Sequence, residues 1–162
     1  MDQPSIVTIL SNTPGWVFLI FIALTILGFQ QIRDRTIGLS RLLMLPLAMS
    51  VFSFYSMISS FGWSTIALSF WLAGLVVAVI AFRKRFSAAS GKLSDSLFWI
   101  KGSWGPFWLM MAIFFIQYFV GYTEAVNSQI LQEIKFTAAI NLAAGFLGGC
   151  FWARTVGIFY HK

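Results

Sequence analysis

Residues 102–122 form an apolar run that is long enough to cross a membrane as one helix. Residues 107–120 carry no charged side chain, and Pro106 falls where the first turn of a helix tolerates a residue without a backbone N–H. Trp104 and Trp108 have apolar rings with one polar N–H, which suits the headgroup level of a bilayer. Because about 20 apolar residues span a hydrocarbon core of roughly 30 Å, this run predicts a transmembrane helix.

Four further runs of this kind occur along the chain, separated by turn residues or by basic clusters. The predicted crossings are residues 14–31, 39–61, 65–82, 104–122 and 136–156. Only 10% of the 162 residues are charged, against roughly 25% in a typical soluble domain. The polar segments are too short to form a soluble domain of their own. We therefore expect an all-α bundle of five transmembrane helices, with residues 1–162 as a single integral membrane domain.

The connection between the third and fourth predicted crossings is the longest charged one in the chain. Residues 94–96 read Ser-Asp-Ser, which is turn chemistry, and short apolar pieces flank them. This pattern predicts a small hairpin on the membrane surface. The alternative is an ordinary solvated loop.

The basic residues are distributed unevenly among the loops. All eleven Lys and Arg residues except Lys135 lie in the segments after the first, third and fifth crossings or in the helix turns beside them. Cytoplasmic loops of membrane proteins carry an excess of Lys and Arg, so we expect the N-terminus outside and the C-terminus in the cytoplasm. The net charge of +6 is accounted for by these loops, and we expect no nucleic-acid partner.

A loose set of polar side chains is expected in the outer half of the bundle at similar depths. Its members are Ser53, Tyr55, Gln117, Tyr118, Glu124 and Asn141. Gln117 lies inside an apolar run, where a side-chain amide without a partner is costly, so it should face the protein interior or an aqueous pocket. Two interpretations remain open. The set lines an outward-facing polar pocket, or it forms interhelical hydrogen bonds that serve packing alone.

Small residues repeat every four positions along the fifth predicted crossing. The predicted packing face consists of Gly145, Gly149, Ala153 and Gly157. Such a stripe lets two helix backbones approach closely, as in GxxxG contacts. The partner is either a neighbouring helix of the same chain or a second copy of the protein.

The residues that would support catalysis or metal binding are scarce. The single histidine, His161, lies one residue from the end of the sequence, and no HExxH or CxxC spacing is present. The acidic residues lie in loops or at helix ends, which argues against ion-coupled transport by a single copy. We therefore predict no catalytic residues, no cofactor and no metal site, and these features favour a non-enzymatic role over an enzymatic one without deciding between them.

Two stretches of the chain resemble a known family. Residues 13–16, 28–31 and 45–49 form one, and residues 102–106 with 117–118 and 120–121 form the other. They resemble an uncharacterised family of small multi-pass inner-membrane proteins of Gram-negative bacteria. The resemblance covers most of the chain and implies a location in the bacterial inner membrane, but it supplies no activity. It also implies that relatives often carry a basic residue where Gln117 stands.

Three functions are compatible with these features. The first is a non-enzymatic scaffold or assembly partner that acts through the glycine face of the fifth crossing, with membrane lipids and either a second copy or another membrane protein as partners. The second is a small channel or facilitator for a small solute, with the serines of the second crossing and Gln117 lining the path. The third is a lipid- or quinone-interacting membrane enzyme.

Overall fold

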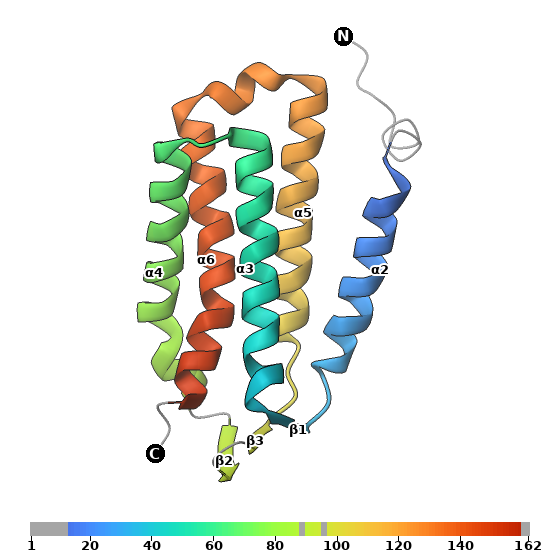
Figure 1. The fold of residues 1–162 in the computed structure, drawn as a ribbon, viewed down its shortest axis with the longest axis vertical. Helices are drawn as coiled ribbons and strands as arrows, with labels where there is room; N and C mark the ends of the chain where they lie inside the picture. The colour runs from blue at the N-terminus through green and yellow to red at the C-terminus, as the bar shows by residue number, and fades with distance from the viewer. Residues whose placement is uncertain (1–12, 88–89, 95–96, 160–162) are drawn as a thin grey trace.

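The computed structural model describes residues 13–87, 90–94 and 97–159 as a bundle of long helices with a small sheet at one end (Figure 1). The elements in chain order are α2 (Gly15–Gln30), β1 (Arg35–Gly38), α3 (Leu39–Phe61), α4 (Thr65–Ser87), β2 (Ser90–Ser94), β3 (Leu97–Ile100), α5 (Gly105–Val126), the 3-10 helix η1 (Ser128–Gln132) and α6 (Ile134–Phe159). We call the two ends of the bundle the sheet end and the η1 end, after the elements that lie there.

Four helices are long and apolar enough to cross a membrane. They are Leu39–Phe61, Thr65–Lys84, Gly105–Val126 and Ile134–Ile158. Helix α2 is apolar but has 16 residues, which at about 1.5 Å per residue is roughly 24 Å long and shorter than a hydrocarbon core. The expectation of a helical membrane bundle is therefore supported by four helices, whereas the first of the five crossings stays a prediction.

Helices α4 and α6 form the closest pair in the bundle. A β-carbon at Gly145 would lie 1.9 Å from the carbonyl oxygen of Trp71, and one at Gly149 would lie 2.5 Å from that of Leu75. Gly74 makes the reciprocal approach, since its β-carbon would lie 2.3 Å from the carbonyl oxygen of Leu142. The two backbones thus touch at positions where a side chain would not fit, which is the small-residue packing of membrane helices.

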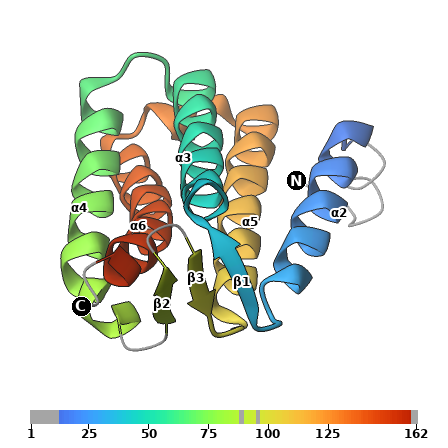
Figure 2. The ribbon, with the colours of Figure 1, turned by 60° about the horizontal axis from the view of Figure 1, so that its bottom comes forward.

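Helix α2 lies beside α5 and apart from the remaining helices (Figures 1 and 2). Aromatic rings join the two helices, with centroid distances of 5.3 Å for Phe21 and Phe114 and 5.4 Å for Phe29 and Phe107. A β-carbon at Gly28 would lie 2.5 Å from the ring of Phe107, so this glycine lets the ring pack against α2. The candidate site lies between this helix pair and α3.

The sheet has three antiparallel strands in the order β1-β3-β2 (Figure 2). Strands β2 and β3 form the predicted hairpin, although its turn residues 95–96 lie outside the described residues. The expectation of an all-α fold was wrong in omitting β1, which pairs with β3 from Arg35↔Ile100 to Gly38↔Leu97. Ile37, Phe98 and Ile100 pack with residues of α3 and α6 in one buried cluster, so the sheet closes this end of the bundle.

Candidate functional site: a cavity between three helices

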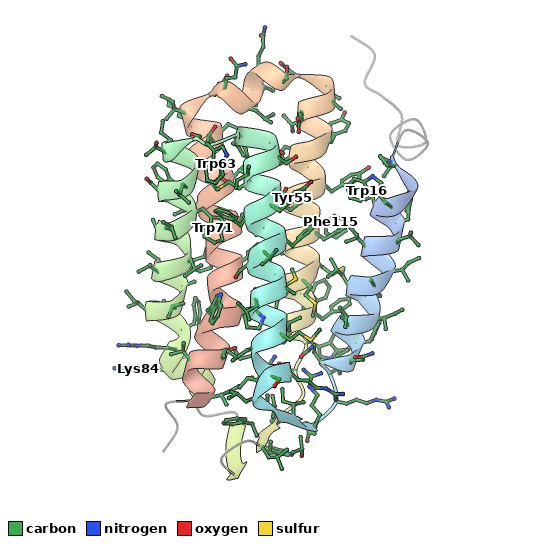
Figure 3. The ribbon with its side chains drawn as sticks, viewed as in Figure 1. Trp16, Tyr55, Trp63, Trp71, Lys84 and Phe115 are labelled. Atoms are coloured by element: carbon green, nitrogen blue, oxygen red, sulfur yellow. The ribbon has the colours of Figure 1, made fainter. Side chains whose placement is uncertain are left out.

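A cavity of about 920 Å³ lies between α2, α3 and α5, in the half of the bundle near η1. Its walls are largely apolar, with Trp16 and Ile20 on α2, Phe52 on α3 and Phe114 on α5. Trp16 and Tyr55 lie at a similar level on α2 and α3 (Figure 3). Because α2 packs along α5 and not along α3, the space between α2 and α3 is left for the cavity.

Gln117 supplies the principal polar group in this cavity. Its Oε1 accepts a hydrogen bond of 2.5 Å from the hydroxyl of Ser56, across the interface between α5 and α3. Among the residues that the structure describes, none accepts a hydrogen bond from the Gln117 amide nitrogen. An amide has two N–H donors, so the side chain retains donors for a molecule in the cavity.

Tyr118 connects the start of α2 to α5. Its hydroxyl lies 2.9 Å from Oγ1 of Thr13, and either oxygen can be the donor. The ring stacks on that of Phe114, with centroids 6.3 Å apart and an interplanar angle of 17°. The hydrogen bond between Thr13 and Tyr118 links the start of α2 to α5 at the η1 end of the cavity. The aromatic pairs described above link the two helices closer to the sheet end.

The structure brings four of the six predicted pocket residues to this cavity, namely Tyr55, Gln117, Tyr118 and Glu124. Glu124 is exposed and also lines a smaller pocket of about 350 Å³ beside η1. The carboxylate therefore lies at the entrance from the η1 end. The cavity also contains polar residues outside the predicted pocket set, which are Thr13, Ser56, Ser59, Ser60 and Tyr122.

Ser53 and Asn141 lie elsewhere, in the packed interior of the bundle. Ser53 is fully buried and accepts a hydrogen bond of 3.0 Å from Nε1 of Trp71. Asn141 is 2% exposed, and its Nδ2 donates to the carbonyl oxygen of Thr137 at 2.8 Å. The Ser53 bond joins α3 to α4, as the packing interpretation expects, whereas the Asn141 bond stays within α6. Neither residue lines the cavity.

The predicted packing face of α6 is directed at α4 of the same chain where Gly145 and Gly149 contact it. Ala153 and Gly157 continue the face and are buried. Of the two partners left open by the sequence, the neighbouring helix is therefore the one that the structure contains. Two serines of α3 serve packing in a similar way, since Trp152 donates to Ser50 Oγ at 2.9 Å as Trp71 does to Ser53.

A family model described as a family of unknown function (DUF6622) matches residues 1–161. No curated protein and no solved structure matches the chain. Within the described residues, no group of three or more His, Cys, Asp or Glu side chains is placed to hold a metal ion.

Proposed function

Since the chain belongs to the DUF6622 family of unknown function, we propose its function from the geometry of the site: it binds one amphipathic, lipid-like molecule inside the membrane. The cavity between α2, α3 and α5 holds this ligand. The observation that carries the proposal is an apolar cavity of about 920 Å³ whose wall contains the Gln117 amide, with donors that no described residue uses.

The size and lining of the cavity support an amphiphile over a polar solute. Ligand cavities in proteins typically measure about 300–1,000 Å³ and are mostly apolar with a few placed polar groups. The rings of Trp16, Phe52 and Phe114 and the side chain of Ile20 favour a hydrocarbon portion. The Gln117 amide favours an oxygen acceptor, such as an ester, a quinone carbonyl or a hydroxyl group. The exposed Glu124 leaves the more polar end of the ligand near the η1 end.

The other two hypotheses have less support. The scaffold hypothesis depends on the glycine face of α6, and Gly145 and Gly149 already contact α4 of the same chain. The channel hypothesis needs a polar path along α3, and Ser50 and Ser53 in the middle of that helix already accept hydrogen bonds from tryptophans. The α3 serines that line the cavity, Ser56, Ser59 and Ser60, all lie in the half of α3 near η1. We therefore assign the protein a binding role in the membrane.

Replacing Gln117 by leucine tests the polar half of this proposal. Gln117→Leu keeps a side chain of similar volume but removes the amide donors, so we expect bound amphiphile to decrease about tenfold, as for the loss of one buried hydrogen bond of about 1.4 kcal/mol. Native mass spectrometry of the purified protein measures the ratio of ligand-bound to free protein. Gln30→Leu is the matched control, because Gln30 is exposed and does not line the cavity. Equal retention by both variants would count against recognition by Gln117.

For the topology, we propose that α2 also crosses the bilayer, that the membrane is the bacterial inner membrane, and that the sheet end faces the cytoplasm. The clustering of basic residues supports this orientation. In a Cys150→Ala background, a membrane-impermeant maleimide added to the outside should label Gln132→Cys in η1 and Gly15→Cys at the start of α2. It should not label Lys84→Cys near the end of α4. Labelling of Lys84→Cys alone would show the opposite orientation.

A further inference from the structure

Three arginines from different elements lie close together at the sheet end. Arg35 begins β1, Arg41 lies in the first turn of α3 and Arg154 lies near the end of α6. Arg35 pairs with Ile100 in the sheet, and Arg154 donates to the carbonyl oxygen of the next residue, Lys101, while Arg41 lies in the first turn of α3, directly after β1. At these positions the charge of Arg35 repels the charges of the other two. Arg35 and Arg154 are half-buried, which reduces the screening of this repulsion by water. We refer to the three residues as the arginine cluster.

Backbone and amide groups hold two of the guanidinium groups in place without neutralising them. Arg35 donates from Nη2 to the side-chain Oε1 of Gln31, which is buried at the end of α2. Arg154 donates from Nη2 to the carbonyl oxygen of Lys101 at 3.5 Å. Both acceptors are uncharged, so the two arginines are oriented while their positive charge remains uncompensated.

Within the described part of the chain, no carboxylate forms an ion pair with the arginine cluster. Among the residues described at this end, Asp34 is acidic, and its Oδ1 accepts a hydrogen bond of 2.7 Å from the backbone N–H of Gly102. Glu124 and Glu133 lie next to η1, at the opposite end. Burial, and then the charge of Arg41, lowers the pKa of Arg35 from its ordinary value, but a guanidinium remains protonated at neutral pH.

A phosphate group satisfies this arrangement better than other anions. A guanidinium presents planar paired N–H donors that match two oxygens of a phosphate, and two or three such groups can share one phosphate. The sheet end is also where the long apolar helices stop, which is the depth at which lipid headgroups lie. Anionic headgroups attract basic residues at this depth.

We propose that Arg35, Arg41 and Arg154 form a binding site for a phosphate group, presented either by the headgroup of an anionic lipid or by a free phosphate ester. The site lies at the opposite end of the bundle from the cavity. It is therefore independent of the proposed amphiphile site, and either can fail without the other. A bound phosphate would link β1, α3 and α6 and so stabilise the sheet end.

The purified full-length protein in neutral detergent allows the two sources to be separated. Dioleoylphosphatidylglycerol, dioleoylglycerol and glycerol phosphate are titrated in turn, and native mass spectrometry and thermal unfolding are followed. We expect the phospholipid to bind and to raise the unfolding temperature. Dioleoylglycerol has the same chains without phosphate, so we expect no binding and no rise in unfolding temperature that depends on the three arginines. Binding of glycerol phosphate with the same dependence on the arginines would support the site with a free phosphate ester as its ligand.

Variants connect the binding to the three arginines. Arg154→Gln is expected to weaken phospholipid binding about tenfold or more, as for the loss of a charge-assisted contact. Arg41→Gln provides a second test if Arg154→Gln does not fold, because Arg41 is exposed and forms no hydrogen bond with another described residue. Arg83→Gln is the matched control, an exposed arginine at the end of α4 outside the cluster. The proposal is overturned if neither phosphate compound binds, or if Arg83→Gln weakens binding as much as the cluster variants.

Discussion

Gly145→Ala is expected to lower the free energy of unfolding by about 3 kcal/mol, as for overpacking at a site that cannot relax. The new β-carbon would lie 1.9 Å from the carbonyl oxygen of Trp71 and 2.7 Å from its carbonyl carbon. Both atoms belong to the backbone of α4, so no side-chain rotation relieves the contact, and α4 and α6 must separate. Thermal or denaturant unfolding in detergent, followed by circular dichroism, measures the change.

Gly148→Ala is the matched control for this prediction, because a β-carbon there meets no other heavy atom within 4 Å. It lies three residues away on the same helix and carries the same change in helix propensity, which favours alanine by about 1 kcal/mol. We expect Gly148→Ala to unfold at the same temperature as the unmodified protein or a higher one. If the two variants were equally stable, the close contact of α4 and α6 would be refuted.

Gly121→Leu is expected to abolish amphiphile binding while leaving the protein at least as stable as before. Gly121 lines the cavity, and a β-carbon at this position meets no other heavy atom within 4 Å. A leucine therefore extends into the space that the ligand would occupy, and in the middle of a helix it is more favourable than glycine by roughly 1 kcal/mol. A variant that loses its ligand because it unfolds would lose stability, so the two explanations are separable.

The matched control for Gly121→Leu is Gly105→Leu, the same change at the opposite end of α5. Gly105 is exposed, and its nearest neighbour, the hydroxyl of Ser103, lies 3.8 Å from the β-carbon position. Ligand retention is measured by native mass spectrometry, and stability by thermal unfolding. We expect a loss of more than tenfold in bound ligand for Gly121→Leu and no change for Gly105→Leu. Equal retention would show that the cavity is not the binding site.

The helices could be predicted from the sequence because each contains a long apolar run bounded by turn residues or by charged ones. The second crossing matches α3 at both ends, since Gly38 precedes it and Gly62 follows it with a φ of 63°. Helix α4 continues past the predicted end at Phe82 through a basic segment as far as Ser87. A charge cluster marks where the membrane ends, but it does not stop the backbone hydrogen bonding of a helix.

Strand β1 could not be predicted because its four residues gain their hydrogen bonds from β3, which is distant in the sequence. The pair of β-branched residues Thr36 and Ile37 was its only local signal. The register that joins Arg35 to Ile100 also brings the arginine cluster together, so that cluster was equally hidden. Local propensity contains no information about such long-range pairing.

The candidate cavity could be predicted in part. Gln117 was recognisable because an amide in an apolar run requires a partner or an aqueous surface. Ser53 and Ser56 are one turn apart on α3, yet Ser53 bonds to Trp71 in the interior and Ser56 to Gln117 at the cavity. Which serine serves which role depends on the helices that pack against α3, and an almost uniformly apolar sequence does not specify that arrangement. The glycine repeat of α6 predicted close packing for a physical reason, but it could not distinguish a helix of the same chain from a second copy.

The central claim, that the cavity selects one amphiphile from the membrane, is tested most directly by photocrosslinking in intact membranes. Benzoylphenylalanine replaces Phe52, whose ring already lines the cavity, and, in a separate protein, Val76, which is half-exposed on α4 and outside the cavity. Mass spectrometry then identifies the adducts. We predict that one chemical class of amphiphile dominates at position 52, whereas position 76 samples the bulk lipids. The same mixture of lipids at both positions would contradict it.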